Sequence, residues 1–320
     1  MAKILAPLLV VAALLVPTSV AAQSAGRPVA LVTAETSNQV IAVSLGPGGG
    51  HVLRRVHLVD PLMIAAPPHG PALVVNPSGT VTLLAWRTLR PIKVFRSFRT
   101  PKVAAVAPDG RLTYVTDEGT GDLSVIDLAR RTVVGRVFVG LEAHHLGISP
   151  DGRWVWVALG ETAKTIVRVD ASNSHKLRVI GRLHPRFGAH DVSFAPDGRT
   201  VWVTSPSTSS VSGYSIGGKL LWTAGAGKPP GHVAFSGGHA LVPSGYGSSV
   251  SAFAWQSPSR APRKAAAPYG SFNLAVYGGF VVTTSLFTGQ VSEYRAGDLH
   301  RLWTTRVAPA ARYVAISVWP

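Results

Sequence analysis

The chain has 320 residues, of which 31 are Lys or Arg and 15 are Asp or Glu, so its formal net charge at pH 7 is +16. It contains no cysteine, which excludes disulfide bonds and a lipid-attachment cysteine. A surface with this charge attracts polyanions such as anionic cell-envelope polymers. No segment combines basic and aromatic residues in a recognition motif, so we do not expect specific binding of nucleic acid.

The first residues have the pattern of a secretory signal peptide. Lys3 precedes an apolar run at 4–16, and small residues at 20–22 form a cleavage site. The apolar run is shorter than the roughly 18 residues that a membrane-spanning helix requires. We therefore expect a signal peptide at 1–22 and a single domain at 23–320 without a transmembrane segment. Such a protein is secreted by a bacterium, or stays in its periplasm or cell wall.

The first folded segment has too few strands for the unit that the rest of the chain repeats. Residues 27–60 contain three runs with strand character, whereas later units contain four. The segment 312–317 matches the missing innermost strand. We expect the N- and C-terminal segments to pair in one blade, because such closure removes exposed edge strands.

From residue 102 onward the chain repeats one short pattern. The stretch 102–111 returns at 144–153 and at 190–199, and all three copies end in Pro-Asp-Gly-Arg. Aligned on the hydrophobic residue two positions before the turn, all copies lie 40 to 46 residues apart, at Ala66, Val106, Ile148, Phe194, Phe235, Val276 and Ile316. A period near 40 with several short strands per unit is typical of β-propeller blades. The sequence therefore predicts an all-β, seven-bladed propeller with four-stranded antiparallel blades.

The repeated units differ in how well they keep the pattern. In the third to fifth units an aromatic residue recurs in the second strand, at Tyr114, Trp156 and Trp202. We expect these rings to fill the space between blades. The sixth unit lacks the Asp-Gly turn, and its Pro-, Arg- and Ala-rich end at 257–268 is predicted to be a loop.

The best copy is similar to a known repeat. It reads Pro-Lys-Val-Ala-Ala-Val-Ala-Pro-Asp-Gly-Arg at 101–111, then Tyr-Val-Thr-Asp at 114–117 and Ser-Val-Ile-Asp at 124–127. This resembles the YVTN repeat family of seven-bladed propellers, which belongs with the lactonase-like and surface-layer propellers. The resemblance implies a secreted or periplasmic bacterial protein, in a family of mostly unassigned function where some members bind nucleic acid or cofactors. It is specific for the fold and not for an activity.

Two series of side chains alternate along the seven predicted inner strands. One position before the alignment point every copy has a small residue, and two positions before it nearly every copy has a bulky apolar one. Because side chains alternate faces along a strand, we expect the bulky series to pack between blades and the small series to line the channel. Two residues further back on the small face lie Met63, Val103, His145, Asp191, His232, Asn273 and Tyr313.

Polar residues gather near this ring position, at one predicted mouth of the channel. The loops that enter the inner strands carry Lys102, Glu142, His144 and His190. The loops between second and third strands carry Glu118, Glu161 and residues 205–209. The predicted ligand site at this mouth consists of Lys102, Glu142, His144, His145, His190, Asp191, His232, Asn273 and Tyr313.

Three hypotheses for this site remain open. In the first, His145, Asp191 and His232 bind a divalent metal, together with Asn273 or a water. Two imidazoles and a carboxylate suit zinc, iron or manganese better than calcium.

In the second hypothesis the protein is a hydrolase or lyase, as the lactonase-like resemblance implies. His144 or His190 is the general base. Glu142 or Glu161 lies beside that histidine, and Lys102 holds an anion. In the third, which we favour, the chain is a monomeric binding module that takes a small ligand at the channel mouth and docks its basic surface to an anionic partner.

Overall fold

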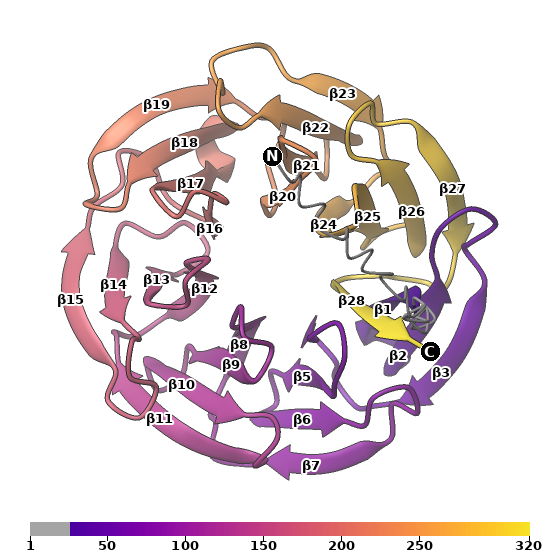
Figure 1. Ribbon diagram of the computed structural model, residues 1–320, viewed down its shortest axis with the longest axis horizontal. Coiled ribbons are helices and arrows are strands. Elements are labelled where there is room, and N and C mark those ends of the chain that lie inside the picture. The colour runs from indigo at the N-terminus through magenta and orange to yellow at the C-terminus, as the bar shows by residue number, and fades with distance from the viewer. Residues whose placement is uncertain (1–25) are drawn as a thin grey trace, which may run out of the picture.

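The computed structural model describes residues 26–320, and the predicted signal peptide lies outside these residues. The described chain forms seven four-stranded antiparallel sheets, arranged as blades in a ring (Figure 1). This confirms the predicted seven-bladed propeller. Besides strands, the described residues contain two short 3-10 turns, η1 (Glu35–Ser37) and η2 (Pro206–Thr208). No helix in this part of the chain is long and apolar enough to cross a membrane.

The first blade takes strands from both ends of the described chain. From the channel outward its strands are β28 (Val314–Trp319), β1 (Arg27–Ala34), β2 (Gln39–Ser44) and β3 (Val52–His57). In the other six blades the chain runs from the innermost strand to the outermost.

Blades two to four are regular. Blade two consists of β4 (Met63–Ala65), β5 (Ala72–Asn76), β6 (Thr80–Leu84) and β7 (Pro91–Phe95). Blade three consists of β8 (Pro101–Val106), β9 (Leu112–Asp117), β10 (Asp122–Asp127) and β11 (Thr132–Phe138). Blade four consists of β12 (Ala143–Ile148), β13 (Trp154–Leu159), β14 (Ile166–Asp170) and β15 (Arg178–Leu183).

Blades five to seven complete the ring. Blade five consists of β16 (Val192–Phe194), β17 (Thr200–Ser205), β18 (Ser210–Ser215) and β19 (Leu220–Gly225). Blade six consists of β20 (Ala234–Ser236), β21 (His239–Ser244), β22 (Ser249–Ala254) and β23 (Arg263–Ala266). Blade seven consists of β24 (Ser271–Tyr277), β25 (Phe280–Ser285), β26 (Gln290–Arg295) and β27 (Arg301–Arg306).

One predicted loop contains a strand. The stretch 257–268 was expected to lack regular structure, yet β23 lies within it and pairs with β22. An outermost strand needs a partner on one side only, so a short polar segment between prolines can fill that place. The prediction was wrong for these four residues.

The ring closes where β1 pairs with β28, as the sequence predicted. The pairing runs from Val32 opposite Val314 to Arg27 opposite Trp319. Just before β28, the Arg312 guanidinium contacts the Glu35 carboxylate at 2.6 Å. The two ends of the described chain are thus held side by side, and no inner strand is left without a partner in its blade.

The Pro-Asp-Gly-Arg turns join the first and second strands of blades three to five. In each turn the Asp carboxylate accepts a hydrogen bond of 2.9 to 3.0 Å from the N–H of the Arg two residues later. The intervening glycine has a φ between +65° and +72°. Glycine adopts this left-handed conformation at no steric cost, which explains why the three turns share one sequence.

The core lies between neighbouring blades. Tyr114, Trp156 and Trp202 are at most 1% exposed, and each ring packs toward the next blade, as predicted. The Trp156 ring, for example, packs edge-on against the Phe194 ring of blade five, with ring centroids 5.9 Å apart. Replacing such a buried aromatic residue with alanine costs about 3–5 kcal/mol, so these rings contribute strongly to holding adjacent blades together.

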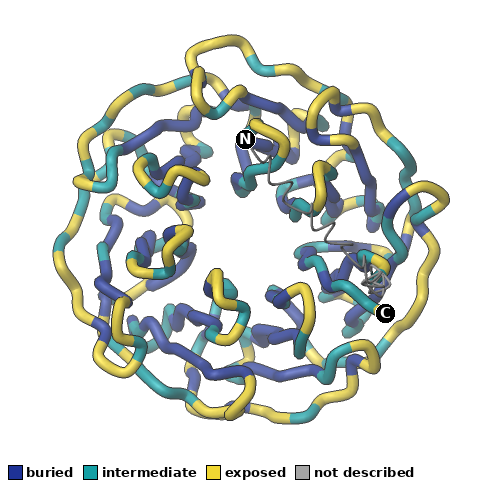
Figure 2. The backbone as a smooth tube through the Cα atoms, in the orientation of Figure 1, coloured by how far each residue is buried: buried dark blue, intermediate teal, exposed yellow. Residues whose placement is uncertain are grey.

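The outermost strands are exposed, whereas the middle strands are buried (Figure 2). The seven outermost strands contain no Asp or Glu. Their exposed Lys and Arg residues are Arg54, Arg55, Lys93, Arg136, Arg178, Arg182, Arg263, Lys264, Arg301 and Arg306. The positive charge of the chain is therefore spread around the rim of the ring.

Small side chains line the channel at the end where the inner strands finish. This alanine mouth is a cavity of about 640 Å³, and its lining includes Ala65, Ala105, Ala234 and Ala275. In blade four the same position is Gly147, where an added Cβ would lie 2.2 Å from the Val192 carbonyl oxygen. Close approach of neighbouring inner strands thus requires the small residues that the repeat pattern shows.

Candidate functional site

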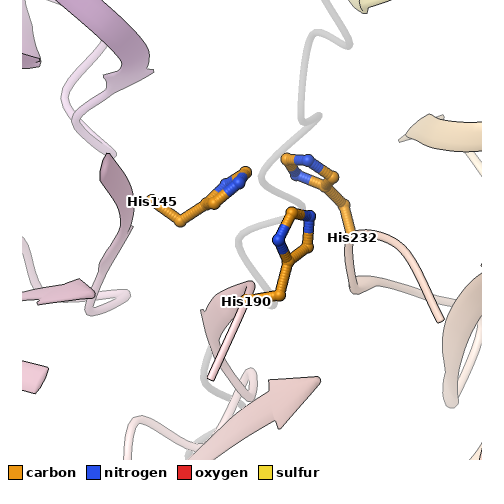
Figure 3. A group of neighbouring side chains, drawn as sticks. All are labelled: His145, His190 and His232. Carbon is orange, nitrogen blue, oxygen red and sulfur yellow. The ribbon is translucent and has the colours of Figure 1, made fainter. Parts of the chain in front are cut away.

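Three histidines from consecutive blades converge at the opposite mouth of the channel (Figure 3). His145 lies on β12, and His190 and His232 lie in the segments that lead into β16 and β20. The ring centroid of His145 lies 4.2 Å from that of His190 and 4.8 Å from that of His232. One ring nitrogen of each histidine lies within 4.8 Å of the other two. We call this group the histidine cluster.

His190 and Asp191 occupy different places from those that strand alternation assigns. The sequence pattern puts Asp191 on the channel face and His190 in the entering loop. However, His190 and Asp191 both form backbone hydrogen bonds with the one residue Thr204 of β17, just before β16 begins, and such a bulge breaks the alternation of a strand. The His190 ring joins the cluster, and Asp191 lies behind the His232 ring, with its Oδ1 at 3.5 Å from the His232 Nδ1.

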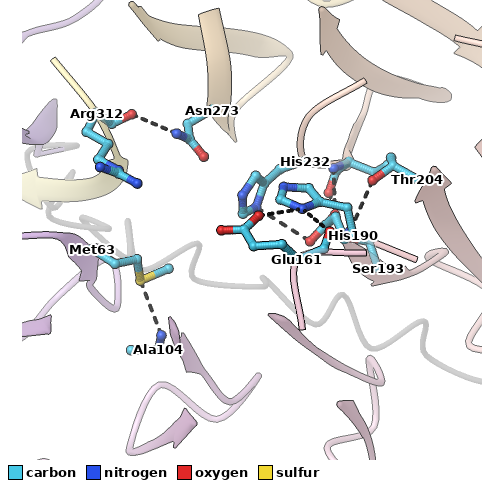
Figure 4. A network of polar contacts seen from close by, with 11 residues as sticks. Met63, Ala104, Glu161, His190, Ser193, Thr204, His232, Asn273 and Arg312 are labelled. Atoms are coloured by element: carbon cyan, nitrogen blue, oxygen red, sulfur yellow. Dashed lines mark hydrogen bonds and ion pairs between the residues drawn. The ribbon is translucent and has the colours of Figure 1, made fainter. Parts of the chain in front are cut away.

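The carboxylates of Glu161 and Asp191 each contact a histidine of the cluster through its Nδ1 atom, and Figure 4 shows the contact between Glu161 and His190. The His190 Nδ1 donates to the Glu161 carbonyl oxygen at 3.1 Å, and it lies 3.3 Å from the Glu161 carboxylate. Asp191 is fixed in turn, because its Oδ2 accepts hydrogen bonds from the Val233 N–H at 2.8 Å and the Ser193 hydroxyl at 2.9 Å. These contacts engage Nδ1 and leave Nε2 of His190 and His232 as the nitrogen available to a ligand.

The third histidine of the cluster is buried without a hydrogen bond at Nδ1. His145 is 1% exposed, and its Nδ1 has no partner among residues 26–320. A buried polar atom without a partner costs about 1–3 kcal/mol of stability. Such atoms in a folded protein point to a strained site or to a bound water or ion.

The pKa values of these groups follow from burial and from Glu161. Burial lowers the pKa of His145 well below its ordinary value and also lowers the pKa of His144 and His232. For His190, burial acts in the same direction, but the hydrogen bond and charge of Glu161 outweigh it and raise the pKa. The hydrogen bond with His190 lowers the pKa of Glu161 to about 2. At neutral pH, His145 and His232 are therefore neutral, which is the form of imidazole that binds metals.

Other predicted site residues surround the cluster at different distances. His144 is buried, and its Nε2 lies 3.6 Å from the Glu161 carboxylate, so that His144, His145 and Glu161 form a second group of potential ligands. Lys102 forms an ion pair with Glu118 at 3.1 Å.

The remaining predicted residues lie around these two groups of potential ligands. Glu142 lines a neighbouring surface cavity together with Glu118 and Glu161. The Tyr313 ring lies edge-on to the His232 ring, with centroids 5.4 Å apart. Asn273 donates through Nδ2 to the Arg312 carbonyl oxygen at 2.9 Å, and its Oδ1 has no partner within the described chain.

The structure adds residues that the sequence pattern did not identify. The histidine cluster opens into a pocket of about 380 Å³, whose lining also includes Tyr246, Phe272, Phe287 and Arg312. Tyr246 and Phe287 lie in the loops between second and third strands of blades six and seven, the loop class that supplies Glu161 in blade four. Alignment of these loops across all blades was the signal that could have found them.

Comparisons with known proteins agree with the fold. Residues 72–167 match the family model for the cytochrome D1 heme domain, a minority of the chain. The chain matches no curated protein. The fold and the site together define a seven-bladed β-propeller with a histidine-rich channel mouth.

Three solved structures resemble this one. A functionally unknown protein from Desulfotomaculum acetoxidans has a TM-score of 0.76 at 14% identity, covering 91% of this chain and 99% of that chain. Hydrazine synthase of Kuenenia stuttgartiensis has a TM-score of 0.62 at 20% identity, covering 74% and 77%. The β-propeller domain of Cps50 (Swd1) from Myceliophteria thermophila has a TM-score of 0.68 at 10% identity, covering 82% and 91%. At these identities the likeness concerns the fold alone.

Proposed function

We propose that this protein is a binding module that holds a divalent transition-metal ion at one mouth of its channel, with His145, His190 and His232 as ligands. The observation that supports it is the convergence of three imidazole nitrogens within 4.8 Å. Tetrahedral zinc binds imidazole at about 2.0–2.1 Å, which places ligand nitrogens about 3.4 Å apart. We propose that metal binding brings the three nitrogens, which lie within 4.8 Å of one another, to that spacing.

The chemistry of the ligands favours certain metals. Imidazole suits zinc, copper, iron and nickel, whereas calcium and magnesium prefer oxygen. Metal-binding histidines usually donate their other N–H to a carboxylate or a carbonyl oxygen, as His190 does to Glu161. We propose that Asp191 likewise orients His232 and does not itself bind the metal. Three protein ligands leave one coordination position open for a further ligand.

The cytochrome D1 likeness raises the question of a heme. A heme iron takes its protein ligands from axial positions on the faces of a flat macrocycle. A heme iron has only two such positions, so three imidazoles with nitrogens within 4.8 Å of one another cannot all serve it. The residues of the histidine cluster do not fit a heme, and we assign none.

A hydrolase or lyase is the second candidate function. Glu161 contacts both His144 and His190, at 3.6 and 3.3 Å, and a carboxylate beside histidines near an open metal position is an arrangement that can activate water. Saturable turnover of lactone esters that disappears in Glu161→Gln would favour this candidate over a binding module.

We further propose that the protein is exported and that its rim docks to an anionic cell-envelope polymer. The pattern at 1–22 and the like-charged outermost strands support this proposal. Retention on heparin should fall as salt rises, and Arg54→Ser/Arg55→Ser should elute earlier than the unmodified protein.

Metal analysis tests the main proposal. We expect the purified protein to carry about one transition-metal ion per chain, or to melt at a higher temperature when zinc is added. The double variant His145→Ala/His232→Ala should carry no metal, and zinc should not raise its melting temperature. The matched control His51→Ala/His300→Ala removes two exposed histidines and should behave as the wild-type protein does. A wild-type protein without metal, whose melting temperature zinc and manganese leave unchanged, would contradict the proposal.

A further inference from the structure

The pocket beside the histidine cluster has an aromatic wall, which consists of Tyr246, Phe272 and Phe287. Tyr246 is 59% exposed and Phe287 is 47% exposed, whereas the aromatic residue Trp156 between blades is 1% exposed. Soluble proteins rarely leave adjacent large apolar side chains open to water unless they bind something. The pocket volume of about 380 Å³ lies in the range of small-ligand sites.

Two glycines fix the rings of this wall against the backbone. A Cβ at Gly245 would lie 2.0 Å from the Phe272 ring, and a Cβ at Gly270 would lie 2.6 Å from the Phe287 ring. Gly270 also has a φ of +88°, which disfavours other residues. The Phe272 ring packs edge-on against Tyr246 and Phe287, with centroids 5.3 and 5.8 Å apart. The wall is therefore held in place before any ligand arrives.

The end of the pocket at the histidine cluster contains the Glu161 carboxylate beside the proposed metal ion. A divalent ion on three neutral imidazoles keeps its charge of +2, and a bound cation of this kind dominates the local field. Arg312 lines the same pocket, where its guanidinium pairs with Glu35. Anionic oxygen donors bind both to arginine and to an open position on a metal ion. This end of the pocket thus suits a carboxylate or a similar oxygen anion.

We propose that the pocket binds a small aromatic acid, whose anionic oxygens coordinate the metal and whose ring lies on the aromatic wall. This inference rests on the proposed metal site, because the histidine cluster and the wall line one cavity. The metal fixes the head of the ligand, and Phe287 and Tyr246 select a flat apolar body over a small alkyl one.

Two hydroxamates with the same chelating head test the inference. Isothermal titration of zinc-loaded protein should show that benzohydroxamate binds at least tenfold more tightly than acetohydroxamate, because only the former has a ring for the wall. Phe287→Ala should reduce this preference to about twofold and leave the zinc affinity unchanged. Phe287→Leu, which keeps apolar contact, should retain an intermediate preference. Phe138→Ala, which removes an exposed ring on the outer strand β11, is the matched control and should behave as wild type.

The outcomes separate the two proposals. If zinc binds and the two hydroxamates bind equally, the ligand inference is overturned while the metal site stands. An unchanged preference in Phe287→Ala also overturns the role of the wall. If zinc does not bind to the wild-type protein, the proposed function itself fails. Thermal melting of each variant shows that the fold is retained, as expected for a half-exposed loop side chain.

Discussion

The two mouths of the channel are built from the same inner strands and have opposite chemistry. Where the strands begin, the side chains facing the channel include His145 and His232. Two residues further along the chain, at the alanine mouth, the corresponding residues are Gly147 and Ala234. The two positions are separated by about 7 Å along a strand.

Because the two mouths share one backbone, the side chains and not the fold determine which mouth can bind a ligand. Alanine and glycine side chains offer neither hydrogen bonds nor metal ligands, and their small size serves the close approach of the strands. The histidine mouth instead holds a buried polar atom without a partner in the described chain, the Nδ1 of His145. Substitutions at the two mouths should therefore separate binding from folding.

Both mouths depend on closure of the ring. The largest loss of stability should therefore follow deletion of residues 309–320. This removes β28, leaving β1 without its inner partner and the channel open on one side. We expect no soluble monomer with a cooperative melting transition, measured by gel filtration and calorimetry. Deletion of the exposed Pro320 alone is the control. A truncated protein with the wild-type melting temperature would refute closure as the source of stability.

Substitution of Asp191, behind the histidine cluster, should lower the zinc affinity. Substitution at the alanine mouth should not. Asp191→Asn keeps an oxygen acceptor but removes the negative charge next to the His232 Nδ1. We expect zinc affinity to fall about 10- to 100-fold. Ala234→Ser, in the same channel at the other mouth, should change zinc affinity less than twofold. Equal zinc affinities for Asp191→Asn and wild type, measured by competition with a chelator, would argue against an orienting role.

The sequence predicted the fold well because each blade repeats one pattern. The Asp-Gly turns, the alternation of small and bulky residues and the unmatched C-terminal strand each follow from local chemistry. The strand β23 was missed because an outermost strand has no buried face on its outer side and so little apolar pattern to recognise.

The site was only partly predictable. His145 and His232 could be found because they share one position of the repeat. His190 joins the histidine cluster because His190 and Asp191 both pair with Thr204 of β17, and strand alternation does not describe such a bulge. Tyr246 and Phe287 lie in loops of unequal sequence, where contacts depend on the finished ring and not on local spacing.

The smallest effect on stability is expected from replacing a carboxylate at the alanine-mouth end of blade three. Asp127 lies opposite Leu112, beyond the last residue pair of the inner strand. Its carboxylate accepts hydrogen bonds from Arg130 at 2.8 Å and from Arg111 at 3.1 Å. Burial by itself would raise the pKa of Asp127, but these hydrogen bonds outweigh it and lower the pKa to about 2.

Because the folded-state pKa of Asp127 lies below the unfolded value of about 3.9, its contribution to stability is present above about pH 4 and disappears as the pH falls through about 2. Both arginines are more than half exposed, so we expect Asp127→Asn to cost a few tenths to about 1 kcal/mol at pH 6. Urea titrations should show the stability gap between the two proteins shrinking as the pH falls from about 4 to about 2, and a gap of constant size over this range would contradict the pairing. Zinc affinity at neutral pH should be unchanged, because Asp127 lies at the far end of the blade from the histidine cluster.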